Sequence, residues 1–373
     1  MTRRGLGFSI VTALVYLAAN QTRVGWLYLI AAAMLAVLGL SCVLAHVWGR
    51  GLSVERNVDQ PVHEGDEAGV RLALRKRGWP AYLLVLRERC PLDASDRSFV
   101  VPQADAAGVA FDYRAQCRLR GRYSLPTAEI ESPGLLGLFR ARTRVGTSTS
   151  VAVYPWFLPE AEWMAARRRS ATEVPSQRAG AGASPLGTRA YRPGDPLRHV
   201  HWRSSARRGE LVVKEFEDER EAGLAIVLDT SRSLGTGRDS TLEYSIKLAA
   251  SLARYAYALG RPFRVLAWPA SGQALAWTAL LEYLADLQVD PSAPRIASLV
   301  SRAASGETLI LASPDLEGAS AALLAHQRRG GRCLAVSFSG FPGAAPPPAG
   351  IPAVPWPAGA DPVDAVRQVI EAL

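Results

Sequence analysis

The chain has little cysteine. Only four of its 373 residues are cysteines, Cys42, Cys90, Cys117 and Cys333, and they are widely spaced. No close-set pair is available to bind zinc, and no dense pattern could staple a small secreted domain. Free thiols in a reducing compartment are the simpler interpretation, and a Cys90–Cys117 disulfide is the alternative if the middle of the chain is exported.

Motifs of common enzymes are also missing. The sequence has no glycine-rich phosphate loop of the Walker type, which argues against ATP binding by this chain. A nucleophile elbow would read Gly-x-Ser-x-Gly, but Asp229 and Thr230 precede Ser231. A phosphotransfer site with an aspartyl nucleophile requires a general acid close by, but position 231 is serine rather than a second aspartate. We therefore expect a protein that is not an enzyme.

The length and charge allow several classes of partner. A chain of 373 residues predicts two or three domains, and a net charge of +9 suits nucleic acid or an anionic lipid surface. The charge alone does not distinguish between these two partners.

The clearest feature is an apolar run over residues 24–48. As a helix, it exceeds the roughly 30 Å thickness of the hydrocarbon layer. Trp26 and Tyr28 near one end and Trp48 at the other match the aromatic belts of membrane helices. We expect this run to span a bilayer, with the buried helix of a soluble protein as the alternative.

A shorter apolar run over residues 5–20 follows Arg3 and Arg4. It is either a first span or the core of a signal peptide. Two spans would form a hairpin whose arginines stay inside, so that the soluble part lies in the cytoplasm. The signal-peptide alternative also leaves the bulk of the chain in the cytoplasm. We expect a two-pass protein of the cell (inner or plasma) membrane.

Periodicity divides the remainder. We expect a transmembrane hairpin over 1–50, an all-β immunoglobulin-like sandwich over 51–156, a linker and basic segment over 157–222, and a doubly wound α/β domain over 223–373. Buried strands are predicted at 224–229, 263–268, 308–313 and 333–338, and helices at 240–260, 279–287, 320–327 and 361–372. The proline-rich residues 341–362 are predicted to be an irregular surface connection.

Oxygen-bearing side chains follow the first strand of the α/β domain. Asp229, Ser231 and Ser233 come directly after a buried strand, at the sheet edge where such folds bind ligands. One carboxylate and two hydroxyls suit Mg²⁺. Asp315 after a later strand and Thr278 before a helix are further candidate ligands. The alternative is that Asp229 and the serines only cap the next helix.

The basic stretch over 191–211 is the second candidate site. A zinc site at His199 and His201 would need one or two further ligands, and none is close in the sequence. A catalytic set of His201 with Ser204 or Ser205 would need a third group to orient the histidine, and none has the right local spacing. A turn at Pro193 that packs the segment by arginine–carboxylate pairs with residues 215–219 is the structural interpretation. The functional interpretation is docking to acidic groups of a partner by Arg192, Asp195, Arg198, Trp202, Arg203, Arg207 and Arg208.

These residues resemble known families. The Asp229-x-Ser231-x-Ser233 pattern looks like the metal-ion-dependent adhesion site (MIDAS) of von Willebrand factor type A domains. The sequence "RAYRPGDPLRHVHWRSSARRGELVVKEFEDE", followed by "LAIVLDTSRSL", is similar to the hallmark of the domain of unknown function 58 family. "EGD" at 64–66 and "GLLGLF" at 134–139 extend the resemblance over nearly the whole chain. It implies a bacterial membrane protein that works with a MoxR-type AAA+ ATPase and a transglutaminase-like membrane protein.

Together these expectations describe a membrane-anchored adaptor for such an ATPase, with an adhesion-type Mg²⁺ site, in assembly or maturation of cell-envelope or other protein complexes. A purely structural scaffold without metal and a basic nucleic-acid-binding membrane protein are the alternatives. Membrane lipid is an expected partner, and nucleic acid is the less favoured one.

Overall fold

The chain forms two compact units, Met1–Pro155 and Trp156–Leu373. The computed structural model describes residues 1–165, 185–191, 200–216, 223–269 and 276–373. Half of the predicted linker and basic segment over 157–222 therefore falls outside the described residues. Each unit is described by itself below.

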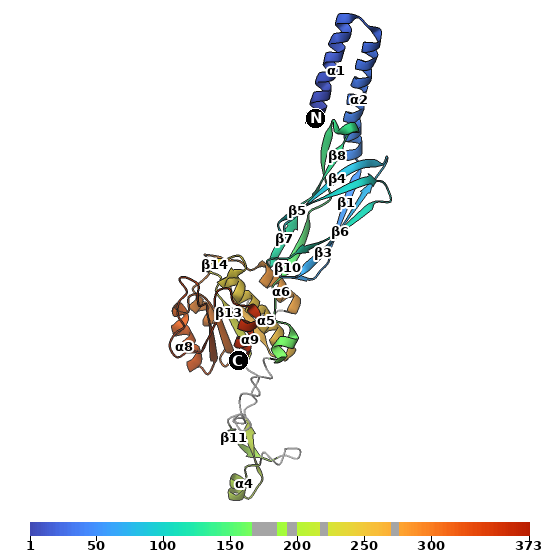
Figure 1. Ribbon diagram of the computed structural model, residues 1–373. Helices are drawn as coiled ribbons and strands as arrows, with labels where there is room; N and C mark the ends of the chain where they lie inside the picture. Colours follow the sequence, from blue (N-terminus) through green and yellow to red (C-terminus); the bar gives the residue numbers. More distant parts are fainter. Residues whose placement is uncertain (166–184, 192–199, 217–222, 270–275) are drawn as a thin grey trace. The chain divides into compact units, whose positions relative to one another are not determined.

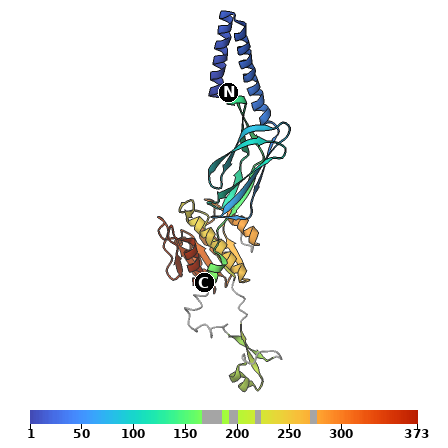
Figure 2. The same ribbon diagram turned by 45° about the vertical axis from the view of Figure 1, so that its right-hand side comes forward.

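The first unit begins with two helices, α1 (Arg3–Thr22) and α2 (Gly25–Gly49), which lie side by side in both views (Figures 1 and 2). The Thr2 side chain caps α1 by accepting from the Gly5 N–H, and Arg23 ends α1 with a left-handed φ of 54°. Among the described residues, α2 is the helix that is long and apolar enough to cross a membrane. An N-terminal signal sequence would share that length and composition.

The rest of this unit is β-sheet, as the alternating pattern predicts. Its strands are β1 (Leu52–Val58), β2 (Val62–His63), β3 (Glu67–Lys76), β4 (Ala81–Cys90), β5 (Ser95–Ala104), β6 (Val109–Gln116), β7 (Gly121–Leu125), β8 (Ala128–Pro133), β9 (Arg140–Val145) and β10 (Thr149–Tyr154). They form three sheets, in the orders β1-β3-β6, β2-β10-β7 and β5-β4-β8-β9. Alternate residues such as Leu72 and Leu74 of β3 and Leu84 and Leu86 of β4 share one core cluster.

A short 3₁₀ turn, η1 (Leu135–Gly137), connects β8 to β9. All four cysteines are free thiols, and Cys90 and Cys117 are buried in this unit without a bridge. The structure thus matches the free-thiol interpretation rather than the disulfide.

The second unit contains a five-stranded parallel sheet, which confirms the predicted α/β class. Its strands are β13 (Leu224–Leu228), β16 (Phe263–Leu266), β17 (Thr308–Ala312), β18 (Arg332–Ser337) and β19 (Ala353–Pro355), in the spatial order β16-β13-β17-β18-β19. Every neighbouring pair is parallel. The accompanying helices are α5 (Thr241–Ala258), α6 (Trp277–Asp286), α7 (Ile296–Val300), α8 (Ser320–Arg328) and α9 (Pro362–Ala372), with the 3₁₀ turn η4 (Glu317–Ala319).

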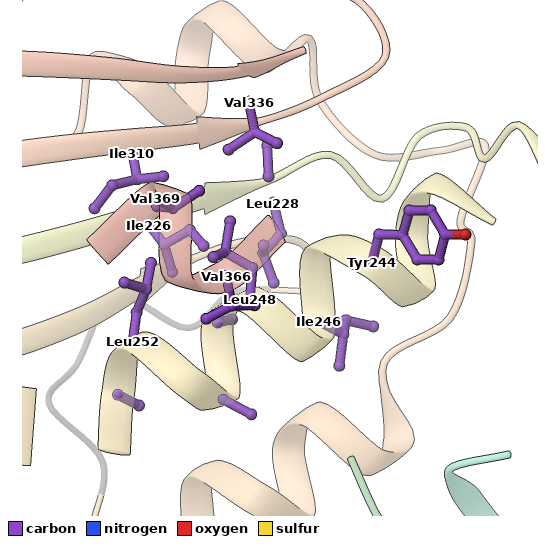
Figure 3. Packing of buried hydrophobic residues seen from close by; sticks show 14 of the residues in the cluster. Ile226, Leu228, Tyr244, Ile246, Leu248, Leu252, Ile310, Val336, Val366 and Val369 are labelled. Atoms are coloured by element: carbon purple, nitrogen blue, oxygen red, sulfur yellow. The ribbon is translucent and has the colours of Figure 1, made fainter. Parts of the chain in front are cut away.

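Helices cover both faces of this sheet. Ile226 and Leu228 of β13 pack with residues of α5 and α9, including Leu248 and Val366, on one face (Figure 3). Val227 of the same strand joins α7 and α8 on the other face. Because successive strand residues point to opposite faces, a strand buried on both sides must be apolar throughout. All five residues of β13 are buried.

The proline-rich connection was predicted wrongly. It supplies the edge strand β19, and Trp356 within it is fully buried and stacks on Tyr244 of α5 at 5.1 Å between ring centroids. The prolines disfavour a central strand, but an edge strand needs only one row of hydrogen bonds. A small hairpin, β14 (Gly235–Thr236) with β15 (Asp239–Ser240), also separates β13 from α5.

Part of the basic segment forms its own small element group. The strands β11 (Pro185–Ala190) and β12 (Val212–Phe216) pair antiparallel, and the short helix α4 (Trp202–Arg208) precedes β12. The Tyr191 N–H donates to the Leu211 carbonyl at 2.8 Å, which extends the pairing beyond β11.

Candidate functional site

The candidate metal site lies at the carboxyl edge of the parallel sheet. Numbered by chain order, the strands run 2-1-3-4-5, so the connections reverse direction between β13 and β17. In such open sheets, ligands bind outside the carboxyl ends of the strands at this reversal. Asp229 follows β13, and Ser313 follows β17.

Asp229 is the centre of a hydrogen-bonded cluster. Its Oδ1 accepts from the Ser231 hydroxyl at 2.6 Å and from the Ser231 N–H at 3.0 Å. Its Oδ2 accepts from the Ser313 hydroxyl at 2.7 Å. Asp229 is only 5% exposed, and Ser313 is fully buried. The cluster thus ties together the ends of the two strands at the reversal.

Ser233 does not join this cluster. Its hydroxyl accepts from the Leu242 N–H at 3.3 Å, in the first turn of α5. Ser240 is the N-cap residue of α5 and accepts from the Glu243 N–H. The capping alternative therefore describes Ser233, whereas the Asp229 carboxylate accepts from Ser231 and Ser313 and from no N–H of α5 in the described part of the chain.

The two later candidates differ in their connection to Asp229. The Asp315 N–H donates to Oγ of Ser313 at 2.9 Å, so that one hydroxyl links both aspartates. The Asp315 carboxylate itself accepts from the Gly318 N–H at 3.1 Å. Thr278 is an exposed residue in the first turn of α6, and no hydrogen bond joins it to Asp229 or Ser231 in the described residues.

Two residues of this edge escape the sequence argument. Ser313 lies in "LASPD", in which only Asp315 was predicted from the sequence as a candidate ligand. Asp290 donates its N–H to the Thr230 carbonyl at 2.8 Å, and its Oδ2 accepts from Trp268 Nε1 at 3.1 Å. A hydrogen bond from the Ser292 hydroxyl, at 2.6 Å, holds the pKa of Asp290 below its usual value. The sequence signal for Asp290 was only an Asp-Pro-Ser turn.

The donor set fits a hard cation only if hydroxyl oxygens take part. Among the described residues, no three Asp, Glu, His or Cys side chains gather where they could hold a metal ion. Asp229, Ser231 and Ser313 offer carboxylate and hydroxyl oxygens, which are the ligands that Mg²⁺ accepts alongside water. A hydroxyl that donates to a carboxylate keeps oxygen lone pairs for a cation. Thr230 Oγ1 is also buried at this edge, and no described residue forms a hydrogen bond with it.

The basic segment is described only in part. Arg192, Asp195, Arg198 and His199 lie outside the described residues, as do the side chains of Arg208 and of residues 213–222 that were expected to pair with arginines. His201 is the N-cap of α4, and its Nδ1 accepts from the Ser204 N–H at 3.2 Å. This hydrogen bond gives His201 a structural role in the helix.

The outward face of α4 carries the exposed side chains of the segment. Trp202 is 65% exposed, and Arg203 and Arg207 are exposed as well. Ser205, in contrast, is buried and accepts from the Val212 N–H at 2.9 Å, which fixes α4 to β12. The helix therefore presents an aromatic ring with two cationic groups.

Fold and site together define a class: a parallel α/β unit with a carboxylate–hydroxyl cluster at its strand reversal, preceded in the chain by a β-sheet region and an apolar helix. Residues 187–273 match the family model described as "Protein of unknown function DUF58". The match includes the whole basic stretch over 191–211, Asp229 and α5, which supports the resemblance noted from the sequence.

The relatives are distant. "Uncharacterized protein YeaD" of Bacillus subtilis (strain 168) is 25% identical over 199 residues, which are 48% of each chain. The chain thus spans about half the length of this curated relative. A solved structure, the PKD domain of an M14-like peptidase from Thermoplasmatales archaeon SCGC AB-540-F20, covers 27% of this chain and 92% of its own at 11% identity, with a TM-score of 0.20.

Proposed function

We propose that the chain is a membrane-anchored, non-enzymatic adaptor for a MoxR-type AAA+ ATPase, and that it engages this partner through a Mg²⁺ ion at the Asp229 cluster. The single observation that carries the proposal is the Asp229 carboxylate, whose two oxygens accept from Ser231 and Ser313 at the strand reversal. A ligand site is expected at this point of the fold.

The chemistry of the cluster suits a bridging cation. Asp229, Ser231 and Ser313 would hold Mg²⁺, with Asp315 next to them through Ser313. A Mg²⁺ ion held by these residues would keep several water molecules and would leave a position for a carboxylate from a partner. Such a site gives binding that depends on a divalent cation, as in the adhesion sites of von Willebrand factor type A domains.

The second contact is the outward face of α4. Trp202, Arg203 and Arg207 suit a partner surface that carries carboxylates, because arginine pairs with them through two parallel hydrogen bonds. Aromatic and arginine side chains also dominate the energetics of protein interfaces. Binding to an acidic protein surface and binding to nucleic acid are separate outcomes of the test below.

The membrane anchor is the hairpin of α1 and α2. Both helices leave large apolar side chains exposed, including Leu14 on α1 and Leu29 and Leu35 on α2. Exposed leucines at this density are costly in water and favourable in lipid. We infer a two-pass topology, with the β-sheet region and the α/β unit on the cytoplasmic side, where Arg3 and Arg4 begin α1 and Arg50 follows α2.

The direct test is binding of the full chain, in lipid nanodiscs, to the MoxR-type ATPase of the same organism. Binding should be strong with Mg²⁺ and weak after chelation. Asp229→Asn should abolish the Mg²⁺ dependence, because an amide lacks the charge that holds the ion. The matched control is Asp364→Asn, which changes an exposed aspartate on α9.

Binding that is equally strong with and without Mg²⁺ would eliminate the cation site. No binding at all would favour the structural scaffold. Binding of DNA with a steep loss of affinity as salt rises would instead favour the nucleic-acid alternative.

A further inference from the structure

The turn η1 is fixed against both helices of the hairpin. The Thr2 hydroxyl donates to the Gly137 carbonyl at 2.8 Å, and the Thr2 N–H donates to the Leu138 carbonyl at 3.0 Å. From α2, the Ser41 hydroxyl donates to the Leu135 carbonyl at 2.8 Å. The backbone at Gly134 approaches so closely that a Cβ there would lie 2.0 Å from the Ser41 carbonyl oxygen. The turn therefore has a defined position beside the apolar helices.

This turn exposes leucine side chains. Leu136 is 67% exposed and has a φ of 54°, in the left-handed region that non-glycine residues rarely occupy. Leu135 is also exposed. The hydrogen bonds from Thr2 and Ser41 hold the strained backbone, and the leucines gain nothing from this arrangement in water.

A second exposed apolar group lies at the end of α2. The Arg77 N–H donates to the Gly51 carbonyl at 2.8 Å, which holds the β3–β4 turn next to the end of α2. The Tyr82 ring contacts the Trp48 ring with 5.8 Å between centroids. Beside these contacts, Trp79 is 82% exposed and Leu83 is 62% exposed.

The two groups lie at different depths along α2. Ser41 precedes Gly49 by eight residues, so the η1 turn lies about 12 Å further along the helix than the β3–β4 turn. The deeper turn carries leucines, and the shallower one carries tryptophan and tyrosine beside Leu83. This is the order of a bilayer, in which aliphatic side chains enter the hydrocarbon and aromatic rings lie at the headgroup level.

A basic cleft lies at the same end of α2. It has a volume of 610 Å³ and is lined by residues of the α2–β1 junction and of β9, among them Arg50, Arg142 and Arg144. The carbonyl end of α2 disfavours an anion, but this effect fades within one turn, and Arg50 follows directly. Arg142 also pairs with buried Glu131 at 3.6 Å. The arginines still outnumber the acids there, which suits the phosphates of anionic lipids.

We propose that this end of the β-sheet region is a bilayer-docking surface. Its apolar rim consists of Trp79, Tyr82, Leu83, Leu135 and Leu136. The two η1 leucines enter the hydrocarbon, and Arg3 and Arg4, which begin α1 at the same depth, extend their side chains to the headgroup layer. The other rim residues occupy the headgroup layer, and the arginines of the cleft face lipid phosphates. The surface orients the β-sheet region on the membrane, beyond the tether that the hairpin provides. The inference rests on the proposed membrane anchor.

Spin labels on the full chain test this surface. Single cysteines replace Leu136, Trp79, Leu29 and Glu67 in a Cys42→Ala background, and the chain is reconstituted into vesicles of phosphatidylethanolamine and phosphatidylglycerol. The other native cysteines are buried, and burial raises the pKa of each of these thiols, so they label poorly. The label at position 29 reports whether the hairpin lies in lipid. The label at position 67, exposed at the end of β3 opposite the β3–β4 turn, is the water-exposed control.

We expect the label at 136 to collide with oxygen rather than with a water-soluble nickel chelate, as the label at 29 does. The label at 79 should have an accessibility to the nickel chelate that is intermediate between those of the labels at 136 and 67. Labels at 136 and 79 that behave like the label at 67, while 29 remains in lipid, would overturn the docking surface and leave the anchor intact. A label at 29 that is open to the nickel chelate would reject the anchor and the docking surface together. Leu135→Cys gives the same readout if Leu136→Cys does not fold.

Discussion

The Ser313 hydroxyl donates to Oδ2 of Asp229 at 2.7 Å and thereby joins the ends of β13 and β17. The two residues are 84 positions apart in the chain, and only the parallel pairing of their strands brings them together. This contact makes the edge of the sheet one connected site.

Ser313→Ala should destabilise the α/β unit. The substitution removes the hydroxyl partner of Asp229 Oδ2 and of the Asp315 N–H, which costs about 1–3 kcal/mol of unfolding free energy. Urea denaturation followed by circular dichroism measures it. The control Ser301→Ala removes an exposed hydroxyl after α7 and should change the free energy by less than about 0.5 kcal/mol. Equal effects of the two substitutions would argue against the connected site.

Gly5→Ala and Gly7→Ala form a matched pair on α1. A Cβ at Gly5 would lie 2.2 Å from the Leu138 carbonyl oxygen, whereas a Cβ at Gly7 meets nothing within 4 Å. Gly5→Ala should therefore destabilise the contact with η1 by about 1–3 kcal/mol. Gly7→Ala should stabilise the helix by about 0.5–1 kcal/mol. Thermal unfolding in detergent tests the pair, and a stabilising Gly5→Ala would contradict the close contact.

Asp93 predicts acid sensitivity in the β-sheet region. Burial raises the pKa of its carboxyl, but hydrogen bonds from Arg97 and Ser95 outweigh burial and lower the pKa to about 2 from its usual 3.8. A depressed pKa contributes stability above the unfolded value, and that stability is lost as pH falls from about 4 to about 2.

The free energy of unfolding should fall by about 1–2 kcal/mol over this pH range, and Asp93→Asn should remove this part of the pH dependence. Urea unfolding at pH 7, 4 and 3 measures it. An unchanged pH profile in Asp93→Asn would show that the ion pair with Arg97 has no such effect.

The α4 face should contribute to partner binding and not to cation binding. Trp202→Ala together with Arg207→Ala should weaken binding of the ATPase by about tenfold or more, because exposed aromatic and arginine side chains are typical interface anchors. The Mg²⁺ affinity should stay unchanged. Arg328→Ala, which changes a cation at the end of α8, is the control. A loss of Mg²⁺ affinity in the α4 variant would mean that the two surfaces are not independent.

Much of the fold was predictable, because buried parallel strands and amphipathic helices have strong patterns. The five apolar residues of β13 and the buried face of α5 are examples. The edge strand β19 was missed because its prolines carry the signal of a loop, while the burial of Trp356 depends on Tyr244, 112 positions earlier. Local sequence holds no information on such a contact.

The site was predicted less completely. Asp229 and Ser231 were found because they follow a buried strand directly, and the structure joins them. Ser233 was assigned to the same cluster, but the β14–β15 hairpin turns the chain so that its hydroxyl meets Leu242 instead. Ser313 could be recognised only once the register of β17 against β13 was known.

The most direct test of the central claim is calorimetric titration of the full chain with Mg²⁺ alone, in wild type and in Asp229→Asn. We predict saturable binding of one ion per chain in the wild type and in the Asp364→Asn control, and none in Asp229→Asn. Equal binding in all three proteins, or no binding in the wild type, would contradict a cation site at Asp229.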